Sequence, residues 1–212
     1  MTMLGTSQQA AGRSTSVGAG APNASRALDW LWRHFQDSAQ PHILDCGPVS
    51  QATLNVLVRR GAKLYVADLV TPARRKDPQF WDRRQKHPVF QVEDFLTQLP
   101  NIPSGSLAAV FCWHLFDLLP PDSLPALVER LCSYLQPGGG TLFCLLRESF
   151  LDAGAETLWW LDRLTILGSG GSGREPFPYP VVTNRAMERL VAPCTVKTFL
   201  TRSGRREVLA IK

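Results

Sequence analysis

Apolar side chains recur every three to four residues in four stretches of the chain, which is the spacing of an amphipathic helix. Ser25 and Thr183 precede two of these stretches as N-cap residues, and Gly61 follows a third as a C-terminal glycine. The pattern therefore predicts four helices. Their apolar positions are Leu28, Leu31, Trp32 and Phe35; Leu54, Leu57 and Val58; Leu124, Leu127, Val128, Leu131 and Leu135; and Met187, Leu190 and Val191.

Short apolar runs lie between these stretches and predict strands. Strands that alternate with helices form a parallel sheet, because a parallel pair needs a crossover connection. The last two runs are joined by residues 201–206, which are too few for a crossover, so they predict an antiparallel hairpin. We therefore expect an α/β fold with a doubly wound, mostly parallel seven-stranded sheet and helices on both faces. The predicted strands are 42–46, 63–68, 89–92, 107–113, 141–146, 195–200 and 207–211.

Two segments depart from this alternation. Residues 1–24 are rich in Ser, Gly, Ala and Gln and predict a flexible tail that precedes a single domain at 25–212. Within residues 150–180, the apolar side chains of Trp159, Trp160, Leu161 and Leu164 predict a helix. That helix either packs into the core or provides a surface for a protein partner.

Composition excludes several classes of protein. Hydrophobic residues make up 44% of the 212 residues, and charged residues make up 19%, so the chain can bury a core. No apolar run reaches the roughly 18 residues of a membrane span, and we expect a cytoplasmic protein without membrane insertion. The net charge of +5 is scattered and does not indicate a nucleic-acid partner. The five cysteines form no CxxC pair and predict reduced thiols with no metal site.

Candidate chemistry gathers where the first three predicted strands end. In a doubly wound sheet, ligands bind at the carboxyl ends of the strands, where the strand order reverses. Gly47 follows the first strand, and Asp68 ends the second strand 21 residues later, a spacing suited to ribose hydroxyls. Asp94 ends the third predicted strand and can accept a hydrogen bond from adenine, with Phe95 beside it as a stacking surface. Together these residues predict an adenosine site with a charged tail near Gly47, although each acid also has a purely structural interpretation as a loop cap.

The order and spacing of several motifs resemble the class I S-adenosylmethionine-dependent methyltransferases, from about residue 26 to the end. The resemblance implies a Rossmann-like methyltransferase fold, S-adenosylmethionine as cofactor, and an unidentified methyl acceptor. The antiparallel hairpin at the end of the chain also fits that family's sheet. The motifs are Ile43–Gly47, Tyr65–Asp68, Glu93–Phe95 with Leu99–Pro100, Ser104–Val110 through Leu118–Pro120, and Leu135–Gly139.

The resemblance implies further contacts near the cofactor. Asp45, Ser50 and Cys112 join the cofactor-binding positions, with Ser50 capping the following helix and donating to the cofactor's carboxylate. Asp45 also has an interpretation as a structural acid. His114 follows the fourth predicted strand and is a candidate general base, or else a wall of the pocket.

The leading functional hypothesis is methyl transfer from S-adenosylmethionine to an unidentified acceptor. Val49 stands where the family often has a second glycine, and Ala108 where an aspartate often begins the fourth strand. These departures support an alternative, a catalytically inactive methyltransferase-like binding or scaffolding subunit of a larger assembly. A nicotinamide-dependent oxidoreductase is a weaker alternative, because such enzymes carry a fuller GxGxxG motif.

Overall fold

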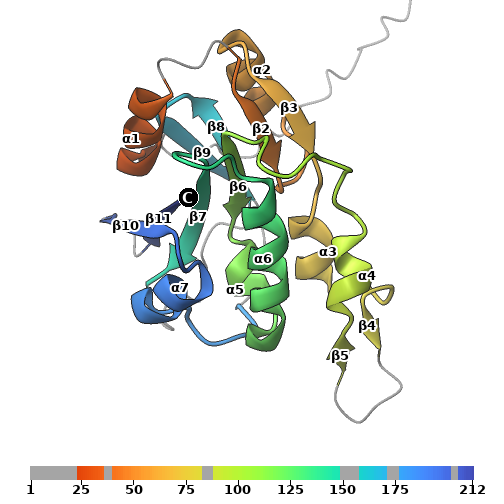
Figure 1. The fold of residues 1–212 in the computed structure, drawn as a ribbon. Coiled ribbons are helices and arrows are strands. Elements are labelled where there is room, and N and C mark those ends of the chain that lie inside the picture. The colour runs from red at the N-terminus through yellow and green to blue at the C-terminus, as the bar shows by residue number, and fades with distance from the viewer. Residues whose placement is uncertain (1–22, 36–39, 83–87, 149–157, 171–176, 202–204) are drawn as a thin grey trace, which may run out of the picture.

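The centre of the molecule is a six-stranded sheet in the order β10-β11-β7-β6-β2-β3 (Figure 1). The strand β11 is antiparallel to both of its neighbours, while β7, β6, β2 and β3 pair in parallel. Five strands therefore share one direction, and β11 alone opposes them. The strands are β2 (His42–Asp45), β3 (Lys63–Val66), β6 (Ala109–Trp113), β7 (Thr141–Arg147), β10 (Thr195–Leu200) and β11 (Arg205–Ile211). The computed structural model describes residues 23–35, 40–82, 88–148, 158–170, 177–201 and 205–212.

All four predicted helices are present in the described chain. Their caps agree with the sequence: Ser25 Oγ accepts from Leu28 N at 3.0 Å, and Thr183 Oγ1 accepts from Ala186 N at 3.1 Å. The helices α6 and α7 lie side by side, and α1 contacts β10 and β11 (Figure 1). The predicted helices are α1 (Arg26–His34), α2 (Gln51–Arg59), α6 (Leu124–Tyr134) and α7 (Asn184–Leu190). The sequence patterns did not predict α3 (Val70–Arg75), α4 (Val92–Leu96), α5 (Leu115–Leu118) or the 3₁₀ helix η1 (Pro121–Ser123).

The predicted third strand does not join the central sheet. Its residues Val89–Phe90 form β5, which pairs only with β4 (Trp81–Asp82) in a separate antiparallel ribbon. The chain then enters α4, where Phe95 packs edge-on against Phe80 and Phe90 at ring-centroid distances of 5.3 and 5.1 Å. Aromatic packing buries this segment without sheet pairing. The described sheet therefore has six strands, and the prediction of a seventh strand at 89–92 is corrected.

A second, three-stranded sheet contains β1 (Asn23–Ala24), β9 (Ile166–Gly170) and β8 (Leu158–Arg163). The helix predicted around Trp159 is wrong, because β8 is a strand in which Trp159 and Leu161 are buried and Leu158 is exposed. This alternation has the two-residue period of a strand. Leu161 N donates to Thr53 Oγ1 at 3.0 Å and so ties β8 to α2. Residues 149–157 and 171–176 of the predicted partner segment lie outside the described residues.

The N-terminus of α1 is fixed to the central sheet. The carboxylate of Glu207 on β11 accepts hydrogen bonds from Ser25 Oγ at 2.9 Å and from Ala27 N at 3.0 Å. Burial raises the pKa of Glu207, which is 2% exposed. Two residues of the predicted tail, Asn23 and Ala24, form β1 against β9, and residues 1–22 lie outside the described part of the chain.

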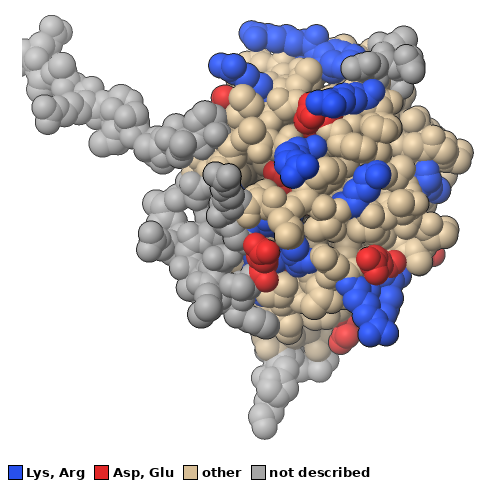
Figure 2. All heavy atoms as spheres, turned by 90° about the vertical axis from the view of Figure 1, so that its left-hand side faces the viewer, with Lys and Arg blue, Asp and Glu red and all other residues tan. Residues whose placement is uncertain are grey.

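The surface in Figure 2 carries Lys and Arg side chains spread over the face, with Asp and Glu side chains between them. This distribution agrees with the scattered positive charge expected from the sequence. Among the described residues, no helix is long and apolar enough to cross a membrane.

Candidate functional site

The candidate site lies where the chain leaves β2. Its neighbours β3 and β6 run parallel to it on opposite sides, and Asp45 at the end of β2 pairs with Val66 and with Phe111. The three strands therefore end at one edge of the sheet. The chain passes from β2 to β3 on one side and later to β6 on the other, so this edge is the point where the strand order reverses.

Asp45 is a buried carboxylate at this edge. Its Oδ1 accepts hydrogen bonds from Gly47 N at 2.9 Å and from Trp113 Nε1 at 2.6 Å. Burial raises the pKa of Asp45 to about 6, the two hydrogen bonds oppose that rise, and the negative charge of Asp68 adds to it. Asp45 and Asp68 therefore interact electrostatically, as expected for acids that follow neighbouring parallel strands.

Glycine is required at position 47 because the Trp113 side chain packs against the backbone there. A Cβ at this position would lie 2.5 Å from Trp113 Nε1 and 2.6 Å from Trp113 Cδ1, closer than carbon atoms can approach. The close backbone approach that the sequence assigns to a ligand is thus made by the Trp113 indole. Val49, the residue in place of a second glycine, is 70% exposed and does not fill this space.

Trp113 has an unusual backbone at the end of β6. Its φ is +51°, in the left-handed region that residues with a side chain rarely adopt. The register between β6 and β7 shifts between Phe111 and Trp113, so the strand carries an irregularity at this point. The side chain is 3% exposed and meets Phe143 edge-on. From the sequence, Trp113 either lines a pocket or completes the core, and no motif there indicated its contact with Asp45.

Asp68 lies two residues beyond the end of β3. Its Oδ1 accepts from Thr71 N at 2.9 Å and so fixes the first turn of α3. This contact is the structural role that the sequence left open beside the ribose-binding role. A carboxylate has two oxygens and about four acceptor positions, so this bond leaves capacity for a ligand. Asp68 is partly buried and remains a candidate for the ribose contact.

Asp94 and Phe95 do not occupy the predicted positions. Both belong to α4, so Asp94 does not end a strand of the central sheet, and its side chain is exposed. Phe95 is fully buried between Phe80 and Phe90 and presents no face for stacking on adenine. The predicted stacking role of Phe95 is corrected to a core role, because its segment is held by aromatic packing and not by strand pairing.

Ser50 and Cys112 have different surroundings. Ser50 is the N-cap of α2 and its Oγ accepts from Thr53 N at 3.4 Å, so the expected cap is present. Cys112 is fully buried on β6. Burial raises the pKa of Cys112 well above its usual value, so the thiol stays protonated. The predicted cofactor contact of Cys112 is replaced by core packing.

His114 belongs to a buried polar cluster. It is 1% exposed, its ring lies beside Trp159 and Phe177, and its Nδ1 is 3.7 Å from Asp117 Oδ2. Burial lowers the pKa of His114, and the nearby Asp117 only partly opposes this change, so the imidazole is neutral near pH 7. Asp117 in turn accepts from Arg147 N at 3.0 Å. The structure thus favours a buried structural role over the predicted general base.

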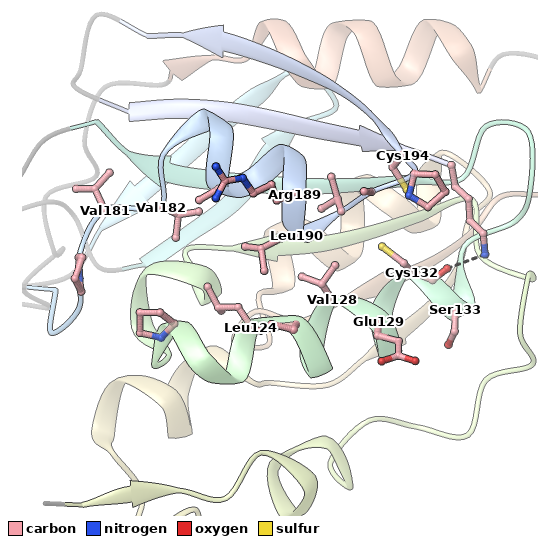
Figure 3. A pocket seen from close by; sticks show the side chains of 18 residues that line it. Leu124, Val128, Glu129, Cys132, Ser133, Val181, Val182, Arg189, Leu190 and Cys194 are labelled. Atoms are coloured by element: carbon pink, nitrogen blue, oxygen red, sulfur yellow. Dashed lines mark hydrogen bonds between the residues drawn. The ribbon is translucent and has the colours of Figure 1, made fainter.

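A large apolar cavity lies away from this edge. This groove between α6 and α7 has a volume of about 760 Å³. Figure 3 shows the side chains of Leu124, Val128 and Leu190 projecting into it. Two further cavities of about 530 and 280 Å³ are lined by other segments. None of these three cavities is lined by Asp45, Gly47 or Asp68. At Gly47, the Trp113 indole occupies the space next to the backbone. Within the described chain, no cluster of His, Cys, Asp and Glu is arranged to hold a metal ion.

No protein-family model and no curated protein sequence matches the chain. A solved S-adenosylmethionine-dependent methyltransferase from Methanosarcina mazei is similar over 85% of this chain and 96% of its own, with 13% identity and a TM-score of 0.45. Another from Leishmania major is similar over 88% of this chain and 72% of its own, with 13% identity and a TM-score of 0.41.

Proposed function

We propose that this protein binds S-adenosylmethionine at the carboxyl edge of β2 and β3 and transfers its methyl group to an acceptor still to be identified. The observation that carries the proposal is the placement of two acids at the edge where the strand order reverses: Asp45 ends β2, and Asp68 lies two residues beyond the end of β3. The single opposed strand β11 supports it, because the family that the sequence resembles has one antiparallel strand in its sheet.

The residues at this edge fit parts of the cofactor. Asp68 has acceptor capacity for ribose hydroxyls, and Asp45 offers a negative charge for a cationic ammonium group above its pKa of about 6. The N-terminus of α2, capped by Ser50, favours a carboxylate. The fit is incomplete at Gly47, where the Trp113 indole occupies the space next to the backbone.

The buried position of His114 does not argue against this activity. S-adenosylmethionine supplies an activated methyl group when it is bound, and transfer depends chiefly on alignment of the methyl group with the acceptor. The protein therefore needs to bind, orient and exclude water more than it needs a general base. The acceptor and a partner that binds residues 150–180 stay predictions from the sequence, as does the cytoplasmic location.

The test is a calorimetric titration of the full chain with S-adenosylmethionine and S-adenosylhomocysteine. A ligand present at about 100 times its dissociation constant adds roughly 2.7 kcal/mol to the free energy of unfolding, so a thermal-shift measurement provides an independent readout. We expect both ligands to bind. Absence of binding to either ligand at millimolar concentration would contradict the proposal.

A second candidate is a methyltransferase-like binding or scaffolding subunit without turnover. The observation that favours it is the Trp113 indole, which fills the turn at Gly47 and bonds to Asp45. Wild-type protein that binds neither cofactor form, while remaining folded, would favour this candidate over methyl transfer.

A further inference from the structure

Trp113 combines three features that ordinary core packing does not require together. Its backbone is in the left-handed region with φ at +51°, the strand register slips beside it, and its Nε1 lies 2.6 Å from Asp45 Oδ1. Left-handed backbone in a residue with a bulky side chain is sparsely populated and persists only where the surroundings hold it. The backbone at Trp113 is therefore held in an uncommon conformation that aims the indole at the ligand edge.

The Trp113 indole occupies two features that the proposed cofactor would contact: the Asp45 carboxylate and the space beside the Gly47 backbone. Asp45 accepts its N–H, and the ring lies so close to Gly47 that a single added carbon would clash. Asp45 is the buried carboxylate available to a ligand ammonium group at this turn, and Gly47 is the point of closest backbone approach. Ligand and indole thus compete for the same acceptor and the same space.

We infer that Trp113 is an autoinhibitory plug: its indole takes the place of the cofactor's amino-acid end, and binding requires the ring to leave Asp45 and Gly47. This inference rests on the proposed function. A protein whose binding-competent state is only fractionally populated has its affinity lowered by that fraction. Only ligands that carry the amino-acid end compete with the indole; the nucleoside alone does not.

The test compares Trp113→Phe and Trp113→Ala with the wild type. Phenylalanine removes the N–H that bonds to Asp45 and shortens the ring, while it keeps an aromatic side chain for packing against Phe143. The matched control is Trp81→Phe, since Trp81 is also 3% exposed but lies in β4, outside the site. Each protein is titrated calorimetrically with S-adenosylhomocysteine, and with 5′-methylthioadenosine, which lacks the ammonium and carboxylate groups.

We expect both Trp113 variants to bind S-adenosylhomocysteine about tenfold or more tightly than the wild type, as for a plugged state populated at about 90%. Affinity for 5′-methylthioadenosine should change less than about threefold, and Trp81→Phe should leave both affinities unchanged. Equal or weaker binding of S-adenosylhomocysteine by Trp113→Phe, with the wild type still binding, overturns the plug and leaves the proposed function standing. If no variant binds either ligand, the proposed function fails and the plug fails with it.

A second measurement uses the wild type and does not depend on how well Trp113→Ala folds. The indole N–H resonance of Trp113, assigned by its loss in Trp113→Phe, should shift when S-adenosylhomocysteine saturates the protein, because the bond to Asp45 breaks. It should stay in place with 5′-methylthioadenosine. A resonance that does not move at saturation with S-adenosylhomocysteine contradicts the plug.

Discussion

Asp68 and Asp94 both follow short apolar runs, yet the tertiary structure treats the two regions differently. The run before Asp68 is β3, which pairs with β2 along four residues and brings Asp68 to the same edge of the sheet as Asp45. The run before Asp94 pairs only with Trp81–Asp82, and the chain turns at once into α4. An acid after an apolar run therefore lies at the edge of the central sheet only when that run is itself a strand of that sheet.

The largest effect that tests this comparison is on stability at α4. Phe95→Ala should lower the free energy of unfolding by about 3–5 kcal/mol, because it empties a fully buried position packed against Phe80 and Phe90. The exposed neighbour provides the control, and Asp94→Ala should change stability by less than about 0.5 kcal/mol. Urea unfolding of both variants measures the difference. Similar losses in the two variants would argue that α4 is not held by this aromatic packing.

A smaller effect concerns the pH dependence at the β2 edge. Because burial raises the pKa of Asp45 from 3.8 to about 6, the folded state holds a proton that the unfolded state releases. The protonated Asp45 carboxyl therefore stabilises the folded state. This stabilisation is fully present below the pKa of the unfolded state and is lost as the pH rises through about 6. It is on the order of 3 kcal/mol, given about 1.4 kcal/mol for each pKa unit.

The measurement is the free energy of unfolding of the wild type and Asp45→Asn between pH 4 and pH 7, roughly the range set by both pKa values. The difference in the free energy of unfolding between the wild type and Asp45→Asn should change across this range, because asparagine does not titrate. Asp68→Asn should move the transition to lower pH, because the charge of Asp68 helps to raise the pKa of Asp45. A difference that stays constant with pH would exclude a buried, titrating Asp45.

The smallest expected effect is on ligand affinity, measured in variants of Asp68 and Asp94. Asp68→Ala should weaken binding of S-adenosylhomocysteine by about tenfold, or roughly 1.4 kcal/mol, while Asp94→Ala should change it less than about twofold. Calorimetry at one pH and one salt concentration measures both. If Asp94→Ala lost as much affinity for S-adenosylhomocysteine as Asp68→Ala, Asp94 would take part in binding. That result would contradict its assignment to an exposed face of α4.

Much of the fold and part of the site could be predicted from local patterns. Ser25 and Thr183 cap helices where their position before an apolar stripe predicted, and Asp45, Gly47 and Asp68 follow neighbouring strands of the sheet. These features depend on hydrogen bonds and periodicities within a few residues, which any folded context preserves. The strand that contains Trp159 was mistaken for a helix because its apolar residues fit both periods over so short a span.

The chain by itself determined where α1, α2, α6 and α7 lie and which segments on either side of Asp45 are strands of the sheet. Only the tertiary structure decided that the residue packed on Gly47 is Trp113, that Glu207 anchors the start of α1, and that Phe95 belongs to the core. The physical reason is distance along the chain: Asp45 meets an indole 68 residues away, and Ala27 meets a carboxylate 180 residues away. Such contacts arise from how strands and helices pack, and no local pattern contains that information.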